Sequence, residues 1–403
     1  MAAALLFLIL AAPLVAQSKP RARDLGVPFD GTPGPLNAIT DVADVEVGHT
    51  TLISGNGRLV VGKGPVRTGV TAVLPRGKAS AAPVFGAWFT LNGNGEMTGT
   101  TWIDESGLVE GPILITNTHS VGVVRDAVIQ WMLEHHPGFE WSLPVVAETW
   151  DGMLNDLNGF HVKPEHVFQA LDGARGGPVT EGAVGGGTGM LCNGFKGGIG
   201  TSSRRLTPEA GGYTVGVLVQ CNYGGQRGLR IAGVPVGREL TEPGVCVAGR
   251  QVPSQSLLRD LPRCSEQAGE PRKAEPGSII IVVATDAPLL PHQLERLVRR
   301  TTLGLGREGS VSSNFSGDIF VAFSTANGET VAADSAFSVR MLPNHRLDPL
   351  FAATVQATEE AVTNAMIAAE TMTGADDVRA YALPHERLRE VLAKYNRLEE
   401  PGR

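Results

Sequence analysis

The sequence predicts a mixed α/β fold in which helices cover sheet within one compact domain. Residues 278–284, SIIIVVA, form an apolar, β-branched run that is typical of a strand buried on both faces. Helical periodicity marks residues 290–303, 350–371 and 385–395, and Pro291 suits the opening turn of the first helix. Because strands and helices occur on both sides of residue 278, both halves of the chain are expected to build this domain.

The other strands are expected to be short and separated by turns. They are predicted at residues 68–74, 113–116, 144–148, 214–221, 319–324 and 331–340. The chain contains 51 Gly and 26 Pro among its 403 residues, which suits a fold with many tight turns. A hydrophobic content of 42% is that of a globular protein, and a formal net charge of -7 gives no electrostatic reason to bind nucleic acid or an anionic membrane.

The first 18 residues are typical of a signal peptide, although no Lys or Arg precedes their apolar core. That core, Leu5–Ala12, is too short to span a bilayer, and residues 16–18 offer a small-x-small cleavage site. We expect residues 1–18 to direct export to the periplasm or the medium, with the cytoplasm as the alternative location. Residues 19–403 would then remain as a single domain.

The four cysteines, Cys192, Cys221, Cys246 and Cys264, are too few and too scattered for a disulfide scaffold. Cys246 and Cys264 bracket a polar stretch and would be able to pair in an oxidising compartment; four free, mostly buried thiols are the alternative. The sequence has no CxxC pair, no HExxH and no EF-hand loop, so no metal site is expected.

The junction at Gly277 and Ser278 is unusual. Residues 251–276 carry four Pro, several charges and no strand or helix period, which indicates an exposed polar loop. The loop ends at Gly277, and Ser278 is the first residue of the predicted buried strand. Because Gly permits a strained backbone, the Gly277–Ser278 bond is a candidate for chain cleavage. The alternative is a Gly-Ser turn that enters a strand.

A serine hydroxyl is inert until a base takes its proton. The chain has no GxSxG between a strand and a helix. His119, in ITNTHSVG after an apolar strand, is one candidate base. An N-terminal serine offers a second, because its own α-amine has an unperturbed pKa of about 8 and is partly neutral near pH 7. Cleavage before Ser278 would create such a serine.

Two further segments place polar groups or glycines where a site would need them. Ser316 and Asp318 stand two apart, so on extended backbone they face the same side and would orient a nearby amine. An ordinary Ser-Gly-Asp turn is the alternative. Residues 185–200, GGGTGMLCNGFKGGIG, lack GxxxxGK[ST] because Gly follows Lys196. We expect this segment to pack its backbone closely beside a site and not to bind a nucleotide.

Segments along nearly the whole chain resemble the DmpA-type family of L-aminopeptidase D-Ala-esterase/amidases and β-aminopeptidases. They are RARDLGVPFDGTPGPLNAITDVADVEVGHT, ITNTHSVG, VVAETWDGMLNDLNG, GGGTGMLCNGFKGGIG, VLVQCNYGGQRGLRIAGVPVG, GSIIIVVATDAPLLPHQLERLVRR, SGDIF and LDPLFAATVQATEEA. The resemblance implies a four-layer αββα sandwich, similar to N-terminal-nucleophile hydrolases but with different connectivity. It also implies oligomers of the cleaved chain pair, commonly tetramers.

The resemblance assigns roles to individual residues. Autoproteolysis at Gly277–Ser278 would give an α chain, 19–277, and a β chain, 278–403. Ser278 would be the nucleophile and, through its amine, the base. Ser316 and Asp318 would position and tune that amine, and Asn222 corresponds to an oxyanion-hole donor.

The chain departs from the family pattern at two places. The family usually has Tyr in an ETYDG block, where its hydroxyl contributes to the oxyanion site, and this chain has Trp150, whose indole N–H donates but cannot accept. The 251–276 loop is also longer than usual.

Glu148, two residues before Trp150, is a candidate to pair with the substrate ammonium; a carboxylate satisfied by local hydrogen bonds is the alternative.

The resemblance therefore implies a self-activated serine aminopeptidase, amidase and esterase that releases N-terminal residues from short peptides, amides and esters without a metal or organic cofactor. Segments such as ATDAPLLPHQLERL favour the L-aminopeptidase and D-esterase type, with a β-aminopeptidase of the same mechanism as the alternative. Two other functions stay open. One is a serine hydrolase that uses His119 and does not cleave itself; the other is a non-catalytic binding protein, for which Trp150 is the hint.

Overall fold

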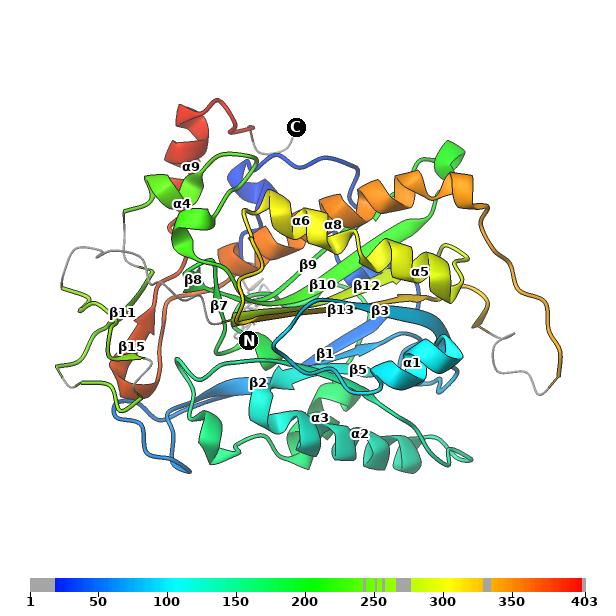
Figure 1. The fold of residues 1–403 in the computed structure, drawn as a ribbon, viewed down its shortest axis with the longest axis horizontal. Helices are drawn as coiled ribbons and strands as arrows, with labels where there is room; N and C mark the ends of the chain where they lie inside the picture. The colour runs from blue at the N-terminus through cyan, green and yellow to red at the C-terminus, as the bar shows by residue number, and fades with distance from the viewer. Residues whose placement is uncertain are drawn as a thin grey trace, which may run out of the picture.

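The fold has four layers, helix, sheet, sheet and helix (Figure 1). The computed structural model describes residues 19–241, 244–250, 252–255, 258–265, 277–328 and 335–400. The outer helical layers are α5 (Pro291–Val298), α6 (Thr301–Arg307) and α8 (Asp348–Ile367) on one side, and α2 (Val121–His135) and α3 (Pro164–Asp172) on the other. The αββα architecture implied by the resemblance is confirmed.

Two sheets form the middle layers. The larger has the strand order β4-β3-β13-β12-β10-β9, with β12 and β13 parallel at its centre, and the smaller has the order β1-β2-β5-β6. Their strands are β1 (Glu46–Ser54), β2 (Val66–Leu74), β3 (Val84–Gly93), β4 (Leu108–Val109), β5 (Ile113–Asn117), β6 (Val145–Thr149), β9 (Gly198–Arg205), β10 (Thr214–Asn222), β12 (Gly277–Thr285) and β13 (Ser316–Ser324).

Smaller elements complete the described chain at the ends of the sandwich. They are the β7–β8 hairpin (Leu191–Cys192, Phe195–Lys196), the sheet of β11 (Val245–Val247), β15 (Val378–Ala380) and β14 (Met372–Thr373), and the helices α1 (Thr100–Ser106), α4 (Val236–Glu239) and α9 (His385–Lys394). No helix among the described residues has the length and apolar character needed to cross a bilayer.

Strand β12 packs on both faces, as its apolar run predicts. Ile279 and Ile281 belong to the cluster beneath α5, α6 and α8, whereas Ile280 and Val282 belong to the cluster between the two sheets. A third cluster fills the space between the smaller sheet and the helices α2 and α3. The alternation of β12 therefore decides which layer each of its side chains enters, and this places Ser278 on the same face as Ile280.

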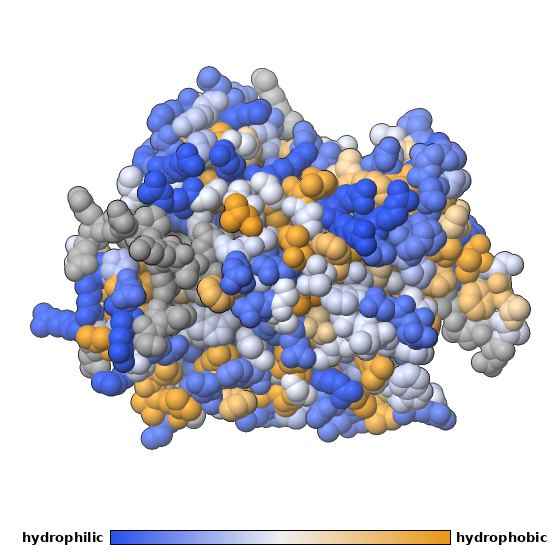
Figure 2. Space-filling view, in the orientation of Figure 1, coloured by the Kyte–Doolittle hydropathy of each residue, from blue (hydrophilic) through white to orange (hydrophobic). Residues whose placement is uncertain are grey.

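Most predicted elements are confirmed, and two are corrected. The helix predicted at 290–303 is two helices, α5 and α6. On the face shown in Figure 2, hydrophilic residues gather over α5, and the surface over α6 is mixed. The strand predicted at 331–340 is wrong for residues 335–340, which are described and irregular; residues 331–334 lie outside the described residues. The predicted signal peptide, 1–18, and much of the predicted loop at 251–276 also lie outside them.

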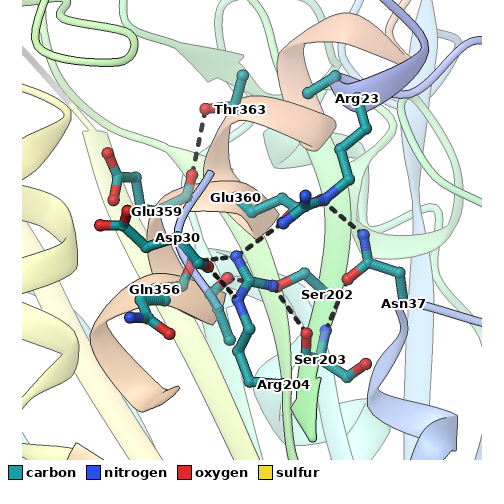
Figure 3. A network of polar contacts seen from close by, with 12 residues as sticks. Arg23, Asp30, Asn37, Ser202, Ser203, Arg204, Gln356, Glu359, Glu360 and Thr363 are labelled. Carbon is teal, nitrogen blue, oxygen red and sulfur yellow. Dashed lines mark hydrogen bonds and ion pairs between the residues drawn. The ribbon is translucent and has the colours of Figure 1, made fainter. Parts of the chain in front are cut away.

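A buried network of charges ties the segment after residue 19 to α8 and β9 (Figure 3). Glu360 of α8 accepts hydrogen bonds from Arg23 and Arg204, at 2.8 and 2.7 Å, and Asn37 also contacts its carboxylate. These partners hold the pKa of the buried Glu360 carboxyl below its usual value, against the effect of burial. The network therefore joins residues on both sides of the Gly277–Ser278 junction.

Two disulfides join the four cysteines. Cys246 pairs with Cys264, as the sequence allowed, and Cys192 of β7 pairs with Cys221 of β10. The alternative of four free thiols is wrong. The sequence does not indicate the pairing of Cys192 with Cys221, because that pairing depends on the β7–β8 hairpin folding against β10.

Candidate active site

Ser278 lies at the start of β12, between β10 and β13 of the larger sheet. Its backbone partners are Asn222 on β10 and Gly317 on β13. The Ser278 hydroxyl oxygen accepts a hydrogen bond of 3.1 Å from the Gly317 N–H, and the residue is only 4% exposed. Because this bond uses the oxygen as an acceptor, the hydroxyl proton stays available for transfer to a base.

Gly277 is extended as part of β12, and its side-chain hydrogen faces the end of β10. A Cβ at this position would lie 2.1 Å from the Asn222 carbonyl oxygen and 3.1 Å from Tyr223 Cα. Glycine is therefore needed for close approach of the backbone, and not for the strained conformation that the sequence suggested. A larger residue would push β12 away from β10 at the Gly277–Ser278 bond.

Ser316 and Asp318 lie on β13 and face the same side, as predicted. The Ser316 hydroxyl donates a hydrogen bond of 2.5 Å to Asp318 Oδ1, and both side chains are buried. Burial raises the pKa of the Asp318 carboxyl, and the bond from Ser316 partly opposes this. The Ser312 hydroxyl and the Ile279 N–H also lower the pKa of this carboxyl, while its buried Oδ2 makes no hydrogen bond of regular geometry.

This pair lies on the helix-covered face of the sheet, opposite to the Ser278 hydroxyl. Alternation along β13 places Ser316 and Asp318 with Phe320, which packs beneath the helices. In register, Ser316 is opposite Gly277 and Asp318 is opposite Ile279. The two side chains thus flank the main-chain nitrogen of Ser278, which is the group that cleavage would convert into an α-amine.

Asn222 points to the same face as Ser278, because the two are direct partners across β10 and β12. Its side-chain oxygen accepts a hydrogen bond of 2.8 Å from the Leu191 N–H, and its Nδ2 donates one of 2.8 Å to the Trp150 carbonyl. An amide nitrogen carries two hydrogens, so one remains to donate. These two bonds fix the orientation of the amide beside the serine.

Trp150 accepts the hydrogen bond from Asn222 through its backbone carbonyl. The indole is half-buried and lies over Gly152, where a Cβ would come within 2.6 Å of the ring. It packs at the edge of a small apolar cluster that includes Met153, Leu154 and Val247. The Trp150 carbonyl is therefore what helps to orient the predicted oxyanion donor.

Glu148 is the penultimate residue of β6, the strand at the edge of the smaller sheet. Its carboxylate accepts a hydrogen bond of 3.1 Å from the Glu96 N–H and a short one from the Thr118 hydroxyl. Burial raises the pKa of the Glu148 carboxyl, and these two bonds oppose the rise. Each carboxylate oxygen can accept more than one hydrogen bond, so local partners leave capacity for a ligand ammonium.

Gly95 lies between the Glu148 carboxylate and Gly317, the β13 residue that pairs with Ser278. A Cβ on Gly95 would lie 3.3 Å from Glu148 Oε1 and 3.2 Å from Gly317 Cα. Because Gly317 is the partner of Ser278, this glycine brings the carboxylate of one sheet close to the nucleophile of the other. Neither Gly95 nor Leu191 was a candidate from the sequence, since both act through contacts between segments far apart in the chain.

His119 follows β5 in a short 3-10 helix, Thr118–Ser120. It is exposed, and its ring stacks on Phe160 with centroids 6.0 Å apart and an interplanar angle of 19°. The structure brings its neighbour Thr118, and not His119 itself, into contact with the Glu148 carboxylate. The Ser278 hydroxyl has the Gly317 N–H, and not the His119 ring, as its hydrogen-bond partner.

The glycine-rich segment 185–200 packs its backbone closely, as expected. A Cβ on Gly187 would lie 2.6 Å from the Ile199 nitrogen, and one on Gly186 would lie 2.6 Å from the Ile115 carbonyl. Among the residues described, no group of three or more His, Cys, Asp or Glu side chains is arranged to hold a metal ion. The side chains brought together at the candidate site carry hydroxyl, amide and carboxyl groups.

Comparisons with known proteins identify the family of the chain. The chain matches the model of Peptidase family S58 over residues 37–380. It is 56% identical over 380 residues to β-peptidyl aminopeptidase BapA of Sphingosinicella microcystinivorans, covering 94% of this chain and 93% of that protein. The BapA of Sphingosinicella xenopeptidilytica is 49% identical, with 93% and 91% covered.

A solved structure supports the same assignment. The L-aminopeptidase D-Ala-esterase/amidase from Ochrobactrum anthropi, described as a prototype for the serine aminopeptidases and a new variant of the Ntn hydrolase fold, matches with a TM-score of 0.81. The two chains are 47% identical, and the match covers 94% of this chain and 100% of that one. The resemblance found in the sequence is thereby confirmed.

Proposed function

The chain belongs to peptidase family S58 and is a serine aminopeptidase with an Ntn-hydrolase-like fold, and on this premise we propose that Ser278 is its nucleophile after cleavage of the Gly277–Ser278 bond. The observation that carries the proposal is the position of Ser278 at the start of β12, between Asn222 on one side and the Ser316–Asp318 pair on the other. No metal or organic cofactor takes part.

Cleavage turns the main-chain nitrogen of Ser278 into an α-amine. In the neutral form this amine accepts the hydroxyl proton as the oxygen attacks the carbonyl carbon of the substrate's N-terminal residue. The proton then passes to the leaving amine, and water hydrolyses the acyl ester on Ser278. Asp318 Oδ2 is buried and makes no hydrogen bond of regular geometry, so it has room for one more donor, which the new amine supplies.

Two side chains supply the remaining interactions. The free amide hydrogen of Asn222 donates to the oxyanion that forms as Ser278 attacks, in a site where such donors are oriented before the reaction. The Glu148 carboxylate binds the ammonium of the substrate, across the gap that Gly95 leaves. A free N-terminus is thereby selected, because an acylated N-terminus carries no charge to pair.

The cleavage step has a direct test. Intact-mass analysis of the purified protein should show two fragments, the smaller of 126 residues, 278–403, beginning with Ser. Ser278→Ala should stay uncut and inactive, whereas His119→Ala should be cut and active. An active enzyme of one uncut mass would contradict the proposal. Cleavage without hydrolysis of any aminoacyl p-nitroanilide would favour a binding protein.

The preferred N-terminal residue is a second part of the proposal. Both alternatives of the sequence analysis, L-residues with D-esters and β-residues, fit the comparisons. The higher identity to two β-peptidyl aminopeptidases leads us to place β-residues first. Parallel assays of the β-Ala, L-Ala and D-Ala p-nitroanilides decide the order, and a higher kcat/KM for L-Ala would overturn it.

Location and assembly are also proposals. We propose export, because the two disulfides suit an oxidising compartment and residues 1–18 have signal-peptide character. A mature chain found in the periplasm, beginning after residue 18, is the expected result. We propose a tetramer of cleaved pairs on the strength of the family resemblance, and a light-scattering mass of a single pair would contradict it.

A further inference from the structure

Lys196 is a fully buried cation at the end of β8. Its ammonium donates hydrogen bonds of 2.7 Å to the carbonyls of Met190 and Gly197, and a longer one of 3.5 Å to Gly187. No ion pair joins it to a carboxylate within the described ranges. Burial lowers the pKa of Lys196 to about 7, while three carbonyl acceptors match the three hydrogens of the ammonium form.

One peptide group links this lysine to the candidate active site. The Met190 carbonyl accepts from Lys196 Nζ and, at 2.9 Å, from the Gly197 N–H. The nitrogen of the same peptide group belongs to Leu191, and its N–H donates 2.8 Å to the side-chain oxygen of Asn222. A cation therefore lies at one end of a peptide dipole whose other end holds the predicted oxyanion donor.

The hydrogen bonds from Lys196 through the Met190–Leu191 peptide group to Asn222 all polarise in the same sense. A positive charge on a carbonyl draws electron density toward the oxygen and makes the N–H of that peptide a stronger donor. A stronger donor to Asn222 Oδ1 in turn makes the Asn222 amide hydrogens more positive. The disulfide between Cys192 and Cys221 flanks this link, since these residues adjoin Leu191 and Asn222 in the chain.

We propose that Lys196 is a positioning residue for catalysis, which fixes and polarises the Asn222 amide through the Met190–Leu191 peptide group. The inference rests on the proposed role of Asn222 as oxyanion donor. It predicts that the charge of Lys196 contributes to kcat more than to KM, because an oxyanion forms only after the substrate has bound.

The test is a double-mutant cycle of Lys196→Met and Asn222→Ala. Steady-state kcat and KM are measured on one p-nitroanilide and normalised to the amount of chain beginning at Ser278. Lys196→Met should lower kcat about tenfold, a fraction of the hundredfold or larger effect of removing the donor itself, and change KM less than about twofold. In the Asn222→Ala background it should have no further effect on kcat. Independent, multiplying effects would overturn the proposal.

Two more variants separate charge from folding. Lys196→Gln keeps a donor for the Met190 carbonyl without the charge, and it replaces Lys196→Met in the cycle if the latter does not fold. Arg204→Met removes another fully buried cation, on β9, that contacts Glu360. It should lower the unfolding temperature without lowering kcat. An equal loss of kcat in Arg204→Met and Lys196→Met would show that Lys196 acts only on stability.

The cycle also distinguishes this inference from the proposed function. If Asn222→Ala leaves kcat unchanged, the oxyanion role of Asn222 is wrong, and Lys196 has nothing to position. If Asn222→Ala lowers kcat and Lys196→Met does not, the oxyanion role holds and the inference about Lys196 is wrong.

Discussion

The Ser316 hydroxyl donates a hydrogen bond of 2.5 Å to Asp318 Oδ1 on the helix-covered face of the larger sheet. Burial disfavours the charged form of this carboxyl and raises its pKa, whereas the bond favours the charged form. Ser316 thus acts on the ionisation of Asp318 as well as on its orientation. Because the pair flanks the nitrogen of Ser278, its charge bears on the base that the mechanism requires.

Ser316→Ala should move the acidic limb of the kcat/KM profile to higher pH. Removing the bond takes away a group that lowers the pKa of Asp318, so that pKa rises further and less of the carboxyl is ionised at a given acidic pH. Profiles of the wild type and the variant, measured over the same pH range, give the shift. A shift to lower pH, or none, would show that ionised Asp318 does not support the reaction.

Glu148→Gln should raise KM for substrates with a free N-terminus. A hydrogen bond to a charged group contributes about 1.5–3 kcal/mol, so loss of the charge should raise KM by roughly tenfold or more. The control is Glu96→Gln, which removes an exposed neighbouring carboxylate and keeps the N–H that binds Glu148. Equal effects of the two variants on KM would mean that the Glu148 carboxylate does not pair directly with the substrate ammonium and acts only through long-range electrostatic attraction.

Gly95→Ala should lower kcat/KM by about tenfold, because small displacements of reacting groups are costly in rate. The new methyl group would lie 3.2 Å from Gly317 Cα and 3.3 Å from Glu148 Oε1, so either β13 or the carboxylate must shift by a few tenths of an ångström. Gly93→Ala, at the end of β3, is the matched control, since its Cβ would have no atom within 4 Å. Similar rates for the two variants would mean that the spacing at Gly95 does not matter.

The fold was predictable where local pattern decides it. The run from Ile279 to Val283 is buried on both faces because every residue in it is apolar, whichever side it faces. The spacing of Ser316 and Asp318 also sufficed to place them on one side, because alternation in a strand needs no tertiary information. The position of Ser278 at the start of β12 follows from the same pattern.

The sequence patterns did not predict which residues from distant segments of the chain are in contact. The face on which the Ser316–Asp318 pair lies depends on how β13 is placed beside β12, and Gly95 matters only because the two sheets meet there. The helix predicted at 290–303 is periodic throughout, yet it breaks between α5 and α6. Recognition of the family supplied the roles of Asn222 and Ser278, which spacing alone left open.

The two disulfides close loops of similar size in different places. Cys192 and Cys221 are 29 residues apart, and Cys246 and Cys264 are 18 apart. By the loop-entropy argument each stabilises the fold by about 3 kcal/mol, so Cys192→Ala/Cys221→Ala and Cys246→Ala/Cys264→Ala should lower the free energy of unfolding by similar amounts.

Only the pair beside Asn222 should also affect catalysis. Removing the bridge between Cys192 and Cys221 frees the β7–β8 hairpin, whose Leu191 N–H holds the Asn222 side chain, so kcat should fall by about tenfold even where the protein stays folded. The Cys246→Ala/Cys264→Ala variant should keep kcat within about twofold, since that bridge joins β11 to residue 264 and does not tie the β7–β8 hairpin to β10, even though β11 packs in the same apolar cluster as Leu191. Chemical denaturation and kcat, measured on both variants at one temperature, separate the two effects. An equal loss of kcat in both double variants would mean that the β7–β8 hairpin does not specifically orient the Asn222 side chain.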